Sequence, residues 1–391
     1  MGTLRFLTAG ESHGKALSAI VEGVPAGLPL SEDYIAADLR RRQAGYGRGQ
    51  RQEIEQDRAQ IISGVRHGLT MGSPIGLSVE NRDWANWQQF MAVEPAPGPV
   101  GKVTGLRPGH ADLPGVMKYL QDDVRPVLER ASARETAARV AVGAVCRRLL
   151  EEFGVRVHSH TVAIGGVEAH LDGEPDWQAV ERSSVRCADP AVEKAMIGAI
   201  DDARNDGDSL GGLLEVWATG VPIGLGSHVH WDRRIDGLLA QALMSIQSVK
   251  GVEIGGGFGL ARQRGSQVQD VILPVAEWGE RPWRRASNRA GGTEGGMTNG
   301  EPVVARAALK PISTIPKALP SADLATGEQV PAHYERADVC IVPAAGVIAE
   351  AMVCIILAQA LLEKFGGDHL EETRRNYHAY LKTIGPRAGG Q

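Results

Sequence analysis

The segment from residue 133 to residue 153 constrains the fold most, because it is the clearest helix in the chain. It is preceded by Arg130 and Ser132, carries Arg134 at its start, and ends at Gly154. A helix that begins in this way directs cations, a hydroxyl and backbone N–H groups at one point, which suits an anionic ligand. The start of this helix is therefore either part of an active site or a solvated, charged surface.

Other strands and helices are mixed along the chain without the regular spacing of repeated βαβ units. Runs of alternating or short apolar character predict strands at 4–8, 61–65, 75–79, 156–167, 213–219 and 303–309. The residues from 116 to 153 are mainly helical, and further helices are expected at 31–43 after Ser31, at 190–205 after Asp189, at 232–250 from Asp232, and at 347–365. This pattern predicts an α+β layered fold in a single domain, residues 1–391, with a flexible Pro- and Gly-rich surface loop at 84–103.

Charge is distributed unevenly along the chain. The net charge of −5 argues against nucleic-acid and acidic-membrane partners, yet six arginines crowd residues 40–58. A positive focus on an acidic protein favours a small anion, and alternating glycines at 45–49 let arginine side chains close over such a ligand.

The apolar segments predict a cytoplasmic protein. The N-terminus lacks the long apolar core of a signal peptide, and the apolar run 340–362 is interrupted by polar residues, so it is expected to be a buried strand and helix instead of a membrane span. The four cysteines form no CxxC pair and are expected to be small core residues in a reducing compartment: Cys146, Cys187, Cys340 and Cys354.

Several common catalytic motifs are absent. The chain has no GxxxxGK[ST], HExxH or GxSxG motif, and the glycines at 255–259 lack the GxGxxG spacing of dinucleotide folds. Two histidine pairs, His158 with His160 and His228 with His230, have a spacing that can bind metal from one face of a strand. No third ligand lies nearby in sequence, so we expect exposed strand residues and no metal site.

Two other histidines have neighbours that favour chemistry. His13 lies in a small-residue loop directly after the first strand, and His110 follows Arg107 and precedes Asp112. Two later segments add candidate anion-binding groups. The glycine-rich run 287–300 exposes backbone N–H groups, and 310–314 adds a cation and two hydroxyls. The pair Arg336 and Asp338, just before the buried run 339–342, is either functional or a surface salt bridge.

Six motifs, in order and spanning essentially the whole chain, resemble those of the chorismate synthase family. They are GESHG at 10–14, GYGRG at 45–49, RPGHAD at 107–112, SARETAARVAVGA at 132–144, GGTEGGMTNGEPVVARAALKPIST at 291–314 and RADVCIVPA at 336–344. The resemblance implies conversion of 5-enolpyruvylshikimate 3-phosphate into chorismate and phosphate by an anti-1,4-elimination. It also implies a requirement for reduced FMN without net redox change, a β-α-β sandwich and a homotetramer.

The resemblance also implies roles for individual residues. His13 corresponds to a histidine near the flavin, His110 to one at the leaving phosphate, and Asp338 to a carboxylate that assists proton removal from the flavin. Arg42, Arg48 and Arg134 correspond to clamps for substrate or for NADPH, a candidate reductant. The implied FMN contacts are Arg130, Ala131, Ser132, Gln247, Ser248, Gly295, Lys310, Pro311, Ile312, Ser313, Thr314 and Arg336.

One position departs from many relatives, and two other functions stay open. Ala131 replaces a hydroxyl-bearing residue found in part of the family, which matters only if that hydroxyl contacts the ligand. The same glycines and arginines would also serve a flavin- or NADPH-dependent oxidoreductase. The arginines at 40–58 alone would serve a non-enzymatic anion- or RNA-binding module, against which the net charge argues.

Overall fold

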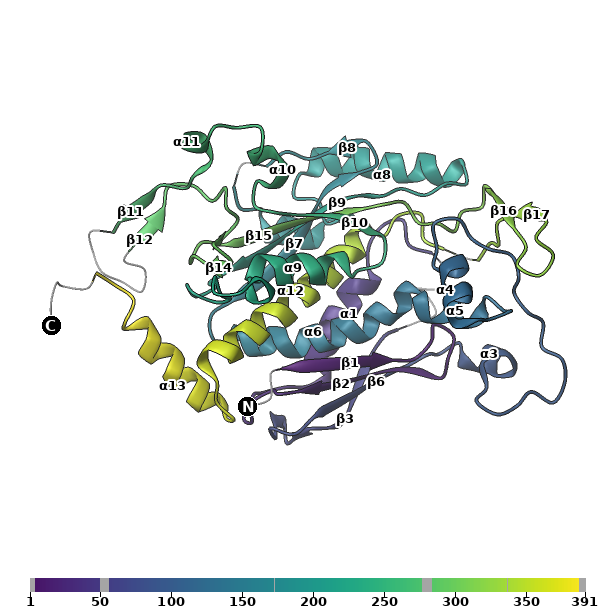
Figure 1. Ribbon diagram of the computed structural model, residues 1–391, viewed down its shortest axis with the longest axis horizontal. Coiled ribbons are helices and arrows are strands. Elements are labelled where there is room, and N and C mark those ends of the chain that lie inside the picture. The colour runs from purple at the N-terminus through teal and green to yellow at the C-terminus, as the bar shows by residue number, and fades with distance from the viewer. Residues whose placement is uncertain (1–3, 50–55, 172, 276–282, 336, 387–391) are drawn as a thin grey trace.

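Two antiparallel sheets enclose a layer of helices in the computed structural model, which describes residues 4–49, 56–171, 173–275, 283–335 and 337–386 (Figure 1). The first sheet has the order β1 (Arg5–Ala9), β2 (Ala16–Glu22), β6 (Ile75–Glu80) and β3 (Ala59–Ser63). The second has the order β10 (Val249–Ile254), β15 (Val303–Leu309), β9 (Gly212–Thr219), β7 (Arg156–Ile164) and β8 (Val167–Glu168). The predicted α+β class with a β-α-β sandwich is confirmed.

The helical layer consists of α1 (Glu32–Gln43), α6 (Thr136–Glu151), α9 (Ile235–Met244) and α12 (Val342–Phe365). Between α6 and α12 the backbones approach so closely that a Cβ on Gly143 would lie 2.3 Å from the Cβ of Ala351. Only glycine fits at such a crossing. By length and composition α12 could cross a membrane, but 89% of its most apolar window is buried inside the molecule. It is the central core helix.

A buried ion network joins this layer to the second sheet. The Glu350 side chain on α12 is fully buried and accepts hydrogen bonds from Arg41, Arg147, Arg186 and Ser159. Burial alone would raise the pKa of Glu350, but the three guanidinium groups outweigh it and hold that pKa far below its usual range. Removing Glu350 would leave uncompensated buried cations, a change that costs about 3–5 kcal/mol in comparable sites.

Two predicted helix starts are confirmed by their caps. Asp189 accepts backbone N–H bonds at the start of α8 (Pro190–Asn205), and Ser31 does so for α1.

The predicted helix at 232–250 is wrong at both ends. Asp232 lies in the short helix η2 (Trp231–Arg233). Helix α9 ends at Met244, and the chain then turns at Ser248, whose φ is +70°, before β10 pairs with β15.

The region 116–153 is mainly helical, as predicted, and it consists of several successive helices. Helix α4 (Asp112–Tyr119) ends at Leu120 in the left-handed region, α5 (Arg125–Ala131) follows, and extended backbone at Ser132 separates it from η1 (Ala133–Glu135) and α6. The segment 84–103 was expected to be a loop, but it begins with α3 (Trp84–Met91). Asp83 accepts side-chain hydrogen bonds from Asn86 and Trp87 there. Residues 92–103 have no helix or strand and are largely exposed, and their flexibility stays a prediction.

All four cysteines are buried and free, as predicted. Short helices and strands surround the two sheets and the helical layer. The remaining elements are β4 (Val65–Arg66), β5 (Leu69–Thr70), α7 (Trp177–Arg182), α10 (Gly257–Leu260), α11 (Gly265–Val268), β11 (Ile272–Pro274), β12 (Trp283–Arg285), β13 (Thr293–Glu294), β14 (Met297–Thr298), β16 (Pro320–Ala322), β17 (Gln329–Pro331) and α13 (Leu370–Leu381).

Candidate functional site

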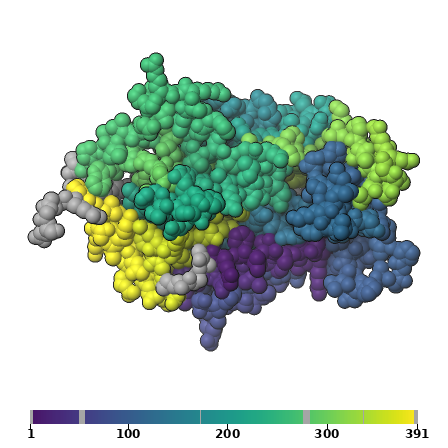
Figure 2. Space-filling model, in the orientation of Figure 1, coloured from purple at the N-terminus to yellow at the C-terminus, as the bar shows by residue number. Residues whose placement is uncertain are grey.

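Three segments that are distant in sequence meet at one end of the sandwich. The loop after β1 bonds to α5 through the Ser12 N–H and the Glu129 carbonyl, 3.1 Å apart, and Leu106 donates its N–H to Ala322. Figure 2 shows this end, where the blue segment around α4 and α5 lies between the purple N-terminal strands and the yellow-green hairpin β16–β17. The two histidines singled out in the sequence, His13 and His110, both belong to this region.

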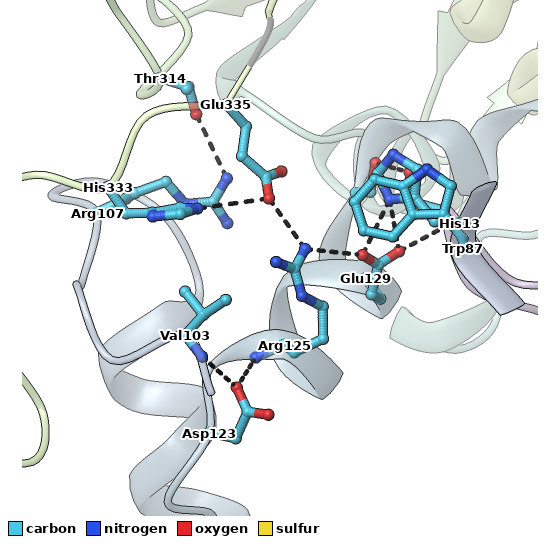
Figure 3. Close-up of polar contacts among 12 residues, drawn as sticks. His13, Trp87, Val103, Arg107, Asp123, Arg125, Glu129, Thr314, His333 and Glu335 are labelled. Carbon is cyan, nitrogen blue, oxygen red and sulfur yellow. Dashed lines mark hydrogen bonds and ion pairs between the residues drawn. The ribbon is translucent and has the colours of Figure 1, made fainter. Parts of the chain in front are cut away.

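His13 is fixed by a buried carboxylate that the sequence analysis missed. Its Nδ1 lies 2.9 and 3.0 Å from the two carboxylate oxygens of Glu129, and its backbone N–H donates to the same carboxylate at 2.7 Å. The ring stacks on Trp87 of α3 with centroids 3.8 Å apart (Figure 3). The signal that could have revealed Glu129 is its place directly before Arg130, as an acid within a helix that is otherwise basic.

Glu129 is the first member of a series of ion pairs. Arg125, one turn earlier on α5, contacts Glu129 at 3.3 Å and Glu335 at 3.0 Å, and Glu335 lies 3.5 Å from His333 (Figure 3). Burial alone would raise the pKa of Glu129, but the hydrogen bonds from His13 and the charge of Arg125 lower it. The chain thus connects the His13 loop to the segment that precedes Asp338.

His110 belongs to a second cluster with the neighbours that its motif suggested. His110 Nδ1 lies 2.5 Å from Asp112 Oδ1, and Arg107 binds Asp112 through Nε at 2.8 Å and Nη2 at 2.9 Å. Asp112 is fully buried; burial alone would raise its pKa, but these partners hold it well below its usual range. An ionised carboxylate therefore orients both His110 and Arg107.

The segment 310–314 lies against this cluster. Arg107 Nη1 donates to Thr314 Oγ1 at 3.4 Å, and a Cβ on Gly109 would lie 3.5 Å from Lys310 Nζ. Burial, together with the charge of Lys250, lowers the pKa of Lys310. Among the described residues no carboxylate lies within ion-pair distance of Lys310. The cation is therefore available to an anionic ligand beside His110.

Gln247 and Ser248 adjoin the same segment. Lys310 donates its backbone N–H to the Ser248 carbonyl at 2.9 Å, which brings the pair beside 310–314. The side-chain oxygen of Gln247 is buried and has no hydrogen-bond partner within the described part of the chain. A buried amide without a partner is costly, and a bound ligand that donates a hydrogen bond would remove that cost.

Arg42 and Arg134 share a carboxylate that the sequence analysis also missed. Asp57, whose side chain is fully buried, forms an ion pair with both, at 3.3 Å to Arg42 and at shorter range to Arg134. Arg42 further donates to Thr136 Oγ1 at 3.0 Å. Burial lowers the pKa of Arg42 to about 9, although Asp57 acts in the opposite direction. Both guanidinium groups are held in place by protein contacts.

The residues before α6 lie against the His13 loop, and Arg48 lies against the C-terminal motif. Ser132 donates its hydroxyl to Ser12 at 3.1 Å, and Arg130 donates to the Thr8 carbonyl, so both face the His13 loop. Arg48 pairs with Asp338 at 2.8 Å. Ala131 is the last residue of α5, and Arg336 lies outside the described residues.

Gly295 is separated from the other candidates. It lies in the turn between β13 and β14, which precedes Val303 at one end of β15, whereas Lys310 follows the other end (Figure 1). Seven residues of strand, roughly 20 Å at about 3.3 Å per residue, lie between these ends. One chain does not bring Gly295 together with Lys310.

The two other histidine pairs form no metal centre. The prediction of exposed strand residues is wrong for His160, which is buried, and for His158, which is half-buried. Both rings lie against Trp177 of α7, and His160 Nε2 lies 3.2 Å from Glu215. His228 and His230 are exposed but lie in irregular backbone before η2. Within the described residues no group of three or more potential metal ligands occurs.

Comparison with known proteins agrees with these motifs. The chorismate synthase family model matches residues 4–362. Chorismate synthase of Desulforudis audaxviator is 57% identical and covers 99% of this chain and 100% of its own length, and that of Streptomyces avermitilis is 52% identical over 98% and 99%. A crystal structure of chorismate synthase matches with a TM-score of 0.78 and 46% identity, covering 98% of each chain. This chain therefore belongs to the chorismate synthase family and is a lyase of aromatic biosynthesis.

Proposed function

We propose that this chain converts 5-enolpyruvylshikimate 3-phosphate into chorismate by anti-1,4-elimination of phosphate. The observation that carries the proposal is the cluster of His110, Arg107, Thr314 and Lys310, in which two cations, a hydroxyl and a histidine converge on a site suited to a phosphate. Membership of the family supports the same reaction and does not favour the oxidoreductase alternative.

Reduced FMN is the proposed cofactor. The unpartnered buried oxygen of Gln247 and the cation of Lys310, without a carboxylate nearby among the described residues, fit a ligand that carries both N–H groups and a phosphate. When bound, reduced FMN supplies the electron that assists phosphate departure and receives it back. The residues proposed to hold it are Arg130, Ala131, Ser132, Gln247, Ser248, Lys310, Pro311, Ile312, Ser313, Thr314 and Arg336.

His110 and Arg107 stabilise the departing phosphate in this proposal. The carboxylate of Asp112 accepts the hydrogen of His110 Nδ1, which leaves Nε2 to face the leaving group as an acid or as part of a cation. The Arg107 guanidinium lies beside it and offsets negative charge that develops on the phosphate.

His13 and Asp338 handle protons on the flavin side. His13, stacked on Trp87, holds or donates a proton at its ring, and Asp338, bound by Arg48 and by the Gly49 N–H at 2.6 Å, assists proton removal. Arg42, Arg48 and Arg134 bind the anionic groups of the substrate, with NADPH as an alternative ligand of Arg42 and Arg48. Asp57 sets the position of two of these three arginines.

The proposed assembly is a homotetramer in the cytoplasm, without nucleic-acid or membrane partners. An assembly of copies matters for Gly295, because a flavin contact from this residue would have to come from a neighbouring chain. Analytical ultracentrifugation of the purified protein tests the tetramer directly.

Anaerobic measurement of phosphate release with reduced FMN and 5-enolpyruvylshikimate 3-phosphate tests the function. We expect one phosphate per chorismate, with no net consumption of reduced FMN. Folded protein that binds FMN but releases no phosphate would refute the proposal. Reductant consumed in proportion to product would instead identify an oxidoreductase.

A further inference from the structure

We propose that Glu129 is a positioning residue for His13: it fixes the orientation and tautomer of the ring, so that proton exchange takes place at Nε2. This inference rests on the proposed role of His13 in the lyase reaction. The pair is built from two elements that are 116 residues apart in the chain, the loop after β1 and the helix α5.

Glu129 holds both the ring and the backbone of His13. One carboxylate contacts Nδ1 with both oxygens, at 2.9 and 3.0 Å, and accepts the backbone N–H at 2.7 Å. Because an ionised carboxylate only accepts hydrogen bonds, Nδ1 carries the hydrogen of the pair. A neutral His13 is therefore the Nδ1–H tautomer, and its basic nitrogen is Nε2.

Burial makes this contact stronger than a surface ion pair. The Glu129 side chain is fully buried and that of His13 is 12% exposed, so water screens their attraction poorly. The lowered pKa of Glu129 keeps the carboxylate charged at neutral pH. A fixed negative charge therefore holds the Nδ1–H group of His13 in place.

The surroundings hold Glu129 itself in place. Arg125 contacts the same carboxylate from one turn earlier and also binds Glu335, which lies near His333. On the other side, Trp87 of α3 stacks against the ring of His13, and the Arg125 guanidinium lies 5.3 Å from the Trp87 ring centroid. The charged groups around the pair therefore come from α5 and from the segment 333–335.

The variant that tests the inference is Glu129→Gln. Glutamine keeps the volume and one acceptor oxygen, but it removes the negative charge beside Nδ1 and replaces the other acceptor oxygen with an N–H donor. We expect kcat to fall about 10- to 100-fold, with little change in KM. Glu129→Asp keeps the charge on a shorter side chain and should recover part of kcat.

Glu215→Gln is the matched control. Glu215 is also a buried glutamate within hydrogen-bond distance of a histidine, His160, but it lies on the second sheet away from the site. We expect its kcat to stay within about twofold of the wild type. If kcat fell equally in Glu215→Gln and Glu129→Gln, the loss would be due to general destabilisation, and the inference would be overturned.

A readout that needs no turnover separates this inference from the proposed reaction. NMR of histidine-labelled protein, with the His13 signals assigned by a His13→Gln variant, reports the tautomer of His13. We expect the Nδ1–H tautomer in the wild type. An Nε2–H tautomer in the wild type would overturn the inference even if the enzyme turns over, and this readout does not depend on the folding of Glu129→Gln.

Discussion

Two histidines of this chain lie beside buried glutamates, and the pairs differ in what else each glutamate binds. Both carboxylate oxygens of Glu129 contact His13 Nδ1, and the same carboxylate accepts the His13 backbone N–H. The ring of His13 stacks on Trp87. Glu215 is shared by His160, Trp217 and Arg306, and His160 Nδ1 has no hydrogen-bond partner among the described residues.

The difference lies in the backbone that carries each histidine. His13 follows a strand in a loop, so its ring orientation is set by the carboxylate. His160 lies within β7 opposite Glu215 of β9, and its orientation is set by the sheet itself. Under the proposed function, the carboxylate that orients the loop histidine serves the reaction, whereas the carboxylate across the sheet serves packing and stability.

The largest effect expected from this comparison is on turnover. His13→Gln should lower kcat by roughly 100-fold, since a positioned proton donor contributes about that much or more. His160→Gln should leave kcat within about twofold of the wild type. Steady-state phosphate release checks both, and similar losses in the two variants would erase the distinction between the pairs.

The next effect is on stability as a function of pH. Burial alone would raise the pKa of Glu215, but hydrogen bonds from His160 and Trp217 and the charge of Arg306 lower it to about 2. The stabilisation is therefore present above pH 4.5 and disappears as the pH falls toward 2.

Glu215→Gln should thus lower the free energy of unfolding by about 3 kcal/mol at neutral pH, with a gap to the wild type that closes below pH 4.5. Urea unfolding from pH 3 to pH 7 measures this, with Glu174→Gln on the exposed surface as control. A gap that is independent of pH would assign the loss to packing instead of charge.

The smallest effect concerns the ring that stacks on His13, since His160 meets Trp177 edge-on instead. Trp87→Leu keeps an apolar side chain but removes the stack, which is worth about 0.5–1.5 kcal/mol. We expect kcat to fall about 2- to 10-fold, with a loss of stability no larger than about 1.5 kcal/mol. Phe90→Leu on the same helix, whose ring meets Trp87 edge-on, provides the control, and equal effects on kcat would exclude a role for the stack.

Periodicity and caps, which are local signals, predicted the α+β class and most of the elements, whereas the β-α-β sandwich was implied by the family resemblance. The start of α8 follows from Asp189 and Pro190, and β15 follows from its alternation. The start of the helix predicted at 133 lies directly after the break at Ser132, whereas the packing of α5 against the His13 loop depends on contacts between distant segments and was not predictable.

The site was predictable to a similar degree. The motifs located His13 and His110, and the structure brings both into one region. Glu129 and Asp57 were missed because their importance arises from partners far away in sequence, which a single chain does not reveal. Gly295 shows a different limit: a motif can be contiguous in sequence although its two ends lie at opposite ends of a strand, and the flavin contact of Gly295 stays a prediction.

The position of α12 has a consequence for biosynthesis. This helix lies at the centre of the molecule, yet it comes from residues 342–365 and contacts α6, which is translated about two hundred residues earlier. The apolar face of α6 must wait for its partner while the ribosome completes the second sheet. The nascent chain is thus most exposed to misassociation late in its synthesis, and a premature stop within α12 would release two sheets that lack their common core.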